Sequence, residues 1–146
     1  MKWVTRKNIR VNRVATAWLI RRFVDPQAEF IFVEPAAVAA VQSGENAKGF
    51  DAPGAIYPHK DGKGRCSFEA LVDEHCSDDS ALVAMAAMVR GADFGEETNL
   101  TEESAGIRTI SQGFPLITSD DHETLEKASF LYDALYASIR AKQQNS

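Results

Sequence analysis

The 146-residue sequence lacks any run of about 18 apolar residues, the length that a membrane-spanning helix requires. Its basic N-terminus also lacks an apolar segment long enough for a signal peptide. Because 45% of the residues are hydrophobic and 25% are charged, the composition is that of a soluble globular protein. We therefore expect one domain over residues 1–146, located in the cytoplasm.

Cysteine is scarce, with only Cys66 and Cys76 in the sequence, which is too few for a disulfide framework. Both are expected at the ends of one helix, where a rise of 1.5 Å per residue separates them by about 15 Å. A disulfide requires Cα atoms within about 7 Å of each other. The sequence therefore predicts no intrachain disulfide.

Acidic residues are missing from the first 24 positions, which hold seven of the 16 lysines and arginines. The rest of the chain carries the other nine bases and all 21 acids. The net charge of −5 is therefore the sum of a basic N-terminal segment and an acidic remainder. Such segregation can steer an anion or a nucleic acid to the surface. It can equally let one part of the protein attract another.

Apolar periodicity predicts an α+β fold that begins with a small sheet. A helix is expected at about 11–24, because apolar residues recur there at i, i+3, i+4 and i+7. It lies between candidate strands at 2–5 and 28–34, an order that favours a βαβ-like parallel crossover. A third strand is expected at 55–60, although Pro58 weakens it.

A helical half is expected to follow residue 66. The predicted helices cover about 67–76, 79–90, 101–112 and 121–142. The long last helix has one apolar face, which should cover the sheet and is formed by Leu125, Ala128, Tyr132, Leu135, Tyr136 and Ile139.

Three side chains at predicted element ends are candidate metal ligands. His59 ends the third strand, Glu69 lies in the first turn of the next helix, and Asp93 follows a helix that Gly91 is expected to end. One imidazole and two carboxylates suit a divalent Zn, Mn, Fe or Ni ion. The alternative is structural, because the helix dipole favours a carboxylate at Glu69 and Asp93 could stabilise a turn. The sequence has no HExxH, CxxC or P-loop motif, any of which would favour a functional site over a structural role.

Other polar residues have two interpretations each. His122 is a reserve metal ligand, but Asp120 and Glu123 on either side of it fit a capping box at the start of the last helix. Arg21 and Arg22 are candidate ligands for an oxyanion, which arginine binds with two parallel hydrogen bonds. Arg22 could equally pair with an acid of the helical half.

The segments WVTR, VNRVATAWLIRRFVDPQAEFIFV, FDAPG, CSFEAL, MVRGADF, DDHETLE and LYDALYA resemble the chromate-resistance domain family, the ChrB C-terminal-like proteins. They span residues 2–137 in the family's order. The resemblance implies a bacterial protein associated with tolerance of chromate. It also implies that His59, Glu69 and Asp93 match the family's site positions and that Arg21 and Arg22 match its arginine pair. Thr16 stands where relatives commonly have cysteine, so no thiol acts at that position.

The sequence is compatible with two classes of function and does not decide whether the protein is an enzyme. The first is a stress protein that binds a metal and a small anionic ligand, such as chromate or a thiol adduct. The second is a non-enzymatic chromate-sensing or protein-interaction domain with a rhodanese-like or regulatory protein partner. Nucleic acid is not an expected partner, because Trp18, an aromatic residue within the basic helix, lies on the core-facing stripe.

Overall fold

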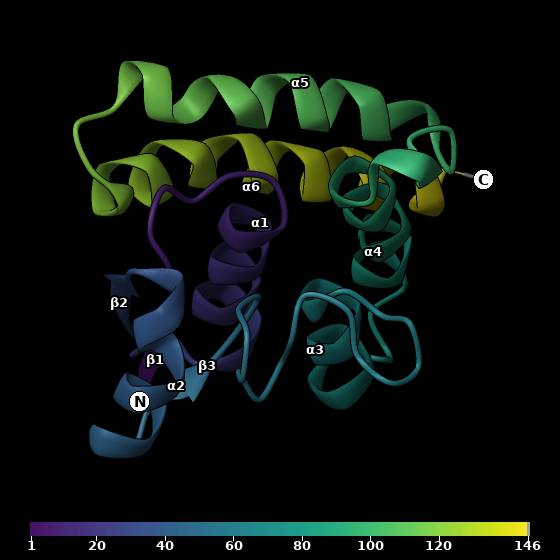
Figure 1. The fold of residues 1–146 in the computed structure, drawn as a ribbon. Helices are drawn as coiled ribbons and strands as arrows, with labels where there is room; N and C mark the ends of the chain where they lie inside the picture. The colour runs from purple at the N-terminus through teal and green to yellow at the C-terminus, as the bar shows by residue number, and fades with distance from the viewer. Residues whose placement is uncertain (146) are drawn as a thin grey trace.

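The computed structural model describes residues 1–145 and confirms the α+β fold, with an N-terminal sheet followed by a helical half (Figure 1). In chain order the elements are β1 (Lys2–Arg6), α1 (Asn12–Leu19), a π-helical turn (Ile20–Val24), β2 (Glu29–Val33), a 3-10 turn (Pro35–Ala37), α2 (Val38–Gly44), β3 (Lys48–Gly49), α3 (Ser67–His75), α4 (Ser80–Asp93), a 3-10 turn (Gly95–Glu97), α5 (Glu102–Ile117) and α6 (Asp121–Gln144).

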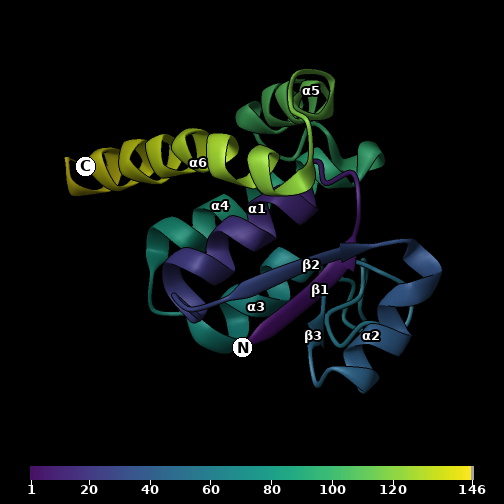
Figure 2. The same cartoon turned by 90° about the vertical axis from the view of Figure 1, so that its left-hand side faces the viewer.

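The sheet has the strand order β2-β1-β3, and both pairings are parallel. Side chains of β1 alternate between the two faces, as in any strand. Trp3 lies in the main core together with residues of α1, whereas Val4 packs with Val38 of α2. The two crossover helices therefore cover opposite faces of the sheet (Figure 2).

The predicted third strand at 55–60 is wrong. The strand that pairs with β1 is Lys48–Gly49, and the later segment contributes only an isolated bridge between Phe50 and Tyr57. Pro58 lacks the N–H that would extend this ladder. The chain consequently forms a long loop between β3 and α3, and Asp51 and His59 both lie in it.

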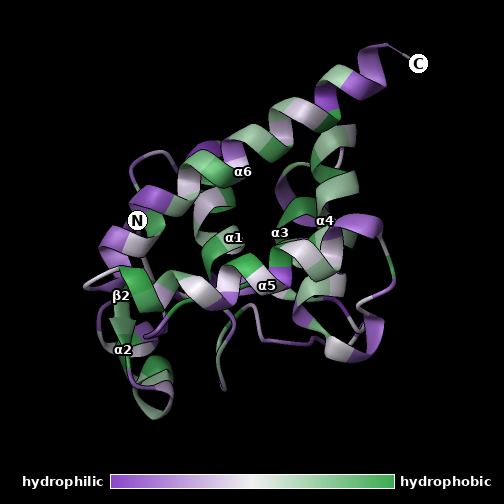
Figure 3. Cartoon of the chain, turned by 90° about the horizontal axis from the view of Figure 1, so that it is seen from above, coloured by the Kyte–Doolittle hydropathy of each residue, from purple (hydrophilic) through white to green (hydrophobic). Residues whose placement is uncertain are grey.

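The structure confirms the predicted helices of the second half. The majority of the helix ends lie within a few residues of the expected positions. The long last helix does not lie on the sheet as expected. It packs on α1 and α4, so that α1 lies between it and the sheet (Figure 2). Its buried face includes Leu125, Ala128 and Tyr132, and the helix becomes hydrophilic toward its C-terminal end (Figure 3).

Gly91 does not end α4, which continues to Asp93. The glycine instead permits close packing of α4 on α5, because a Cβ atom there would lie 2.3 Å from Ser104 Oγ. The two additional residues of helix place Asp93 at the last helical position rather than in a loop.

Cys66 and Cys76 are free thiols, as predicted. No helix within residues 1–145 is sufficiently long and apolar to cross a membrane.

Candidate metal centre

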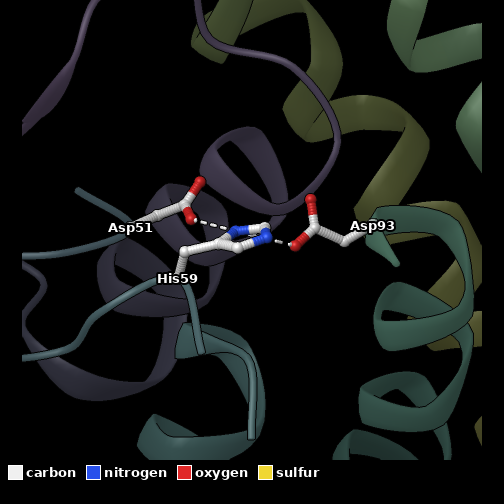
Figure 4. A group of neighbouring side chains, drawn as sticks. All are labelled: Asp51, His59 and Asp93. Atoms are coloured by element: carbon white, nitrogen blue, oxygen red, sulfur yellow. Dashed lines mark hydrogen bonds and ion pairs between the residues drawn. The ribbon is translucent and has the colours of Figure 1, made fainter. Parts of the chain in front are cut away.

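His59 lies between two carboxylates, those of Asp51 and Asp93 (Figure 4). Its Nδ1 atom is 2.8 Å from Asp51 Oδ1 and 3.3 Å from Asp93 Oδ2. One ligand atom from each of the three residues lies within 4.8 Å of the other two. The structure thus brings His59 and Asp93 together as predicted, with Asp51 as the third member of the group.

Asp51 is fixed by backbone and side-chain contacts. Its N–H donates to the Tyr57 carbonyl oxygen at 2.7 Å, and its φ of 49° is unusual for a residue other than glycine. The side chain is 1% exposed, and its Oδ2 atom lies 3.3 Å from both the Arg6 and the Arg13 guanidinium groups. The other oxygen, Oδ1, faces His59. The two arginines thus neutralise one side of a buried carboxylate and leave the other side for a cation or a proton.

Asp93 is held in an unfavourable electrostatic environment. It ends α4, where the negative end of the helix dipole destabilises a carboxylate. Its side chain is 12% exposed, and Oδ2 has no hydrogen-bond partner within residues 1–145. The contact with His59 meets the distance of an ion pair but not the geometry of a hydrogen bond. Burial, with a further contribution from the negative charge of Asp51, raises the Asp93 pKa to about 6.

His59 is the accessible member of the group, with a side chain that is 50% exposed. Its ring also lies edge-on against Phe94, with 5.3 Å between the ring centroids. The hydrogen bond with Asp51 raises the pKa of the imidazole, and the charge of Asp93 adds to this effect. The position between two carboxylates therefore favours a positive charge, carried by a proton on Nδ1 or by a metal ion in its place.

Glu69 is not part of this group. Its Oε1 atom accepts hydrogen bonds from the Cys66 N–H at 3.0 Å and from Arg90 Nη1 at 3.1 Å. The first bond belongs to a capping box at the start of α3, and Arg90 is also bonded to Glu97. The position of Glu69 in the first turn was predicted, and its structural interpretation fits the observed contacts.

The arginine pair lies apart from the three residues. Arg22 makes a two-bond contact with Asp133, at 3.0 Å from Nε and 2.9 Å from Nη2, which is the structural alternative considered from the sequence. The guanidinium group of Arg21 lies over the Phe30 ring, 5.1 Å from its centroid.

The reserve ligand His122 is exposed and packs edge-on against Phe32. Asp120 caps α6 by accepting the Glu123 N–H at 2.8 Å, and the Glu123 carboxylate accepts the Ser119 N–H. The acidic cluster around His122 therefore starts a helix, as the capping interpretation predicted.

Asp51 is the member of the group that sequence reasoning missed. The segment Asp51-Ala-Pro-Gly54 has the composition of a turn, and aspartate is common in turns for local reasons. Nothing in its spacing indicates that two arginines from the N-terminal segment reach it. The charge segregation was the available signal, since Arg6 and Arg13 belong to the acid-free stretch.

Comparisons with known proteins agree with the resemblance of the motifs. The family model described as "ChrB, C-terminal domain" matches residues 3–139. A curated relative, Protein ChrB of Cupriavidus metallidurans, is 34% identical over 136 residues, which cover 92% of this chain and 40% of that protein. The chain thus spans about two fifths of that relative's length. No solved structure matches.

Proposed function

Because the chain belongs to the ChrB C-terminal domain family, a chromate-resistance family, we propose that it is a bacterial oxyanion-stress domain that binds one divalent metal ion. The ligands in this proposal are Asp51, His59 and Asp93. The metal ion would take the place of the proton between the imidazole and the two carboxylates.

The observation that carries this proposal is the state of Asp93. Its buried Oδ2 atom lacks a hydrogen bond within the described residues, although it lies 3.3 Å from an imidazole nitrogen. Leaving a buried polar atom without a partner destabilises the folded state by about 1–3 kcal/mol, and by more if the group is charged. A cation bound beside Oδ2 removes that cost, which supports a metal site at this position.

The ligand set narrows the choice of metal. One imidazole nitrogen and two carboxylate oxygens suit Zn, Mn, Fe or Ni better than Ca²⁺, which takes six to eight oxygen ligands. Three protein ligands also leave coordination positions open for water or a substrate. The half-exposed side of His59 is where such a ligand could enter.

Metal analysis of the protein purified without an affinity tag tests this function, followed by calorimetric titration of the metal-free protein with Zn²⁺, Mn²⁺ and Ni²⁺. We expect near-stoichiometric binding of one metal in the wild type and its loss in His59→Ala. The matched control is His122→Ala, which removes an exposed histidine outside the group and should bind metal normally. Normal binding by folded His59→Ala protein would contradict the proposal.

The same preparations separate the two classes of function. Turnover of an oxyanion or of its thiol adduct by the metal-loaded protein would indicate an enzyme. Saturable chromate binding without turnover would favour the alternative, a chromate-sensing domain that acts through a protein partner.

A further inference from the structure

We propose that a cavity beside the three-residue group is a binding site for a small, doubly charged oxyanion of the sulfate, molybdate or chromate type. The cavity has a volume of about 190 Å³ and is lined by Arg10, Val11, Arg13, Asp93, Arg108 and Gln112. This inference deepens the proposed function, because it adds the anionic ligand to the metal centre and shares Asp93 with it.

Arg13 supplies the first argument. Its side chain is 12% exposed, and two of its nitrogens are occupied, Nη1 by Asp51 and Nη2 by the Asn8 carbonyl oxygen. The third nitrogen, Nε, is buried and has no hydrogen-bond partner among residues 1–145. A buried donor without an acceptor is rare in proteins and calls for a ligand or water. Arg13 also lines the cavity, so its positive charge is available to attract an anion there.

Arg10 and Arg108 supply the second argument, because they come from different parts of the chain to the same cavity. Arg10 precedes α1 and is exposed, and it makes no ion pair with any residue that the structure describes. Arg108 lies on α5 and donates one hydrogen bond, from Nη1 to the Ala92 carbonyl oxygen at 3.0 Å. A guanidinium has five N–H donors, so Arg108 keeps others for a ligand. Three arginines against one carboxylate give the cavity an excess of positive charge.

The cavity is of a size that fits a small anion. Sites for drug-sized ligands have volumes of about 300–1,000 Å³, and this cavity is smaller. It suits an inorganic oxyanion rather than a nucleotide. Planar guanidinium groups bind such oxygens in pairs, which favours a tetrahedral anion over a halide. The positive N-terminal end of α1, which Val11 precedes, offsets the negative end of the α4 dipole at Asp93.

The two unpartnered buried atoms are complementary. Asp93 Oδ2 is an acceptor that lacks a cation or donor, and Arg13 Nε is a donor that lacks an acceptor. Both residues line the same cavity. With a metal ion on the Asp93 side and an oxyanion on the Arg13 side, the metal would reduce the repulsion between Asp93 and the anion. The arginines of this site are not the pair expected from the sequence, since Arg22 is bonded to Asp133.

Calorimetric titration with sodium molybdate and sodium sulfate tests this site, with metal-free and Zn²⁺-loaded protein in low salt. Molybdate and sulfate have the shape and charge of chromate without its oxidising power. We expect saturable binding at one site and a loss of about tenfold in affinity in both Arg10→Gln and Arg108→Gln, since one hydrogen bond to a charged group is removed in each. Arg108→Lys, which keeps the charge but not the paired N–H donors of the planar guanidinium group, should bind with intermediate affinity.

The matched control is Arg21→Gln, which removes one positive charge outside the cavity and should bind both anions like the wild type. Thermal unfolding confirms that each variant is folded before titration. Wild-type affinity in Arg10→Gln and Arg108→Gln, or an equal loss in Arg21→Gln, would overturn the site. Protein that binds Zn²⁺ but neither anion would overturn this inference alone, whereas protein that binds an anion but no metal would overturn only the proposed metal centre.

Discussion

Asp51 and His59 meet at 2.8 Å although both lie in the long loop between β3 and α3, outside regular secondary structure. The position of Asp51 is nevertheless fixed, because its backbone bonds to Tyr57 and its side chain is paired with Arg6 and Arg13. The loop brings a histidine to a buried carboxylate, and the end of α4 brings a second carboxylate to the same imidazole.

Metal affinity should decrease as the pH falls. A metal ion binds to the neutral imidazole and to ionised carboxylates, so protons compete with it. Because Asp51 raises the pKa of His59 and burial raises the pKa of Asp93 to about 6, protons compete with the metal at a higher pH than for ordinary histidine and aspartate side chains. The range from pH 7.5 to 5.5 covers the titration of Asp93. Each proton displaced on binding lowers the affinity by about tenfold per pH unit below the pKa of its group. Calorimetric titrations with Zn²⁺ across this range measure the effect, and an affinity that does not change with pH would contradict it.

Replacing Asp93 with Asn should stabilise the metal-free protein while weakening metal binding. A carboxyl group whose pKa is raised in the folded state destabilises that state once the pH exceeds its ordinary pKa of 3.8, and fully so above about 6. At pH 7.5 its removal should therefore increase the free energy of unfolding, by at most about 3 kcal/mol. Urea unfolding at pH 7.5 and pH 4 provides the measurement, and the gain should shrink at pH 4. Lower stability of Asp93→Asn at pH 7.5 would show that the carboxylate is a structural group.

Glu69→Ala should reduce stability and leave metal binding unchanged. The substitution removes the capping box of α3 and the bond to Arg90, and loss of a helix cap alone typically destabilises by about 0.5–2 kcal/mol. A matched control is Glu126→Ala, which removes an exposed glutamate on α6 and should change the free energy of unfolding little. Chemical unfolding measures the stability of the two variants, and Zn²⁺ titration measures their metal affinity. Loss of Zn²⁺ binding by folded Glu69→Ala protein would contradict this prediction and indicate that Glu69 is a metal ligand.

The sequence predicted the helices well and the site in part. Helical periodicity depends on neighbours three and four positions apart, so it located α3 to α6. The third strand was misplaced because β3 has only two residues, too few to show alternation, whereas the segment around Tyr57 has strand-like composition. Gly91 was interpreted as a helix end because glycine is common at that position. The actual need for glycine comes from the proximity of Ser104, a contact between two helices that the sequence pattern does not show.

The sequence pointed to Glu69 rather than Asp51 for the same reason, because tertiary contacts cannot be read from local spacing. Both are acids near His59 in the chain, and residue type and spacing favoured the acid on a helix end. Glu69 is held by local partners, a backbone N–H three positions away and Arg90. Asp51 is held by arginines about 40 positions earlier, which only the tertiary fold brings to it.

Anomalous diffraction from crystals of the Zn²⁺- or Mn²⁺-loaded protein tests the metal centre most directly, because it locates the ion itself. We expect one strong peak at about 2 Å from Asp51 Oδ1, His59 Nδ1 and Asp93 Oδ2, with small side-chain shifts that close the group around the ion. A peak at His122 or at Glu69, or no peak between Asp51, His59 and Asp93 in fully loaded crystals, would contradict it.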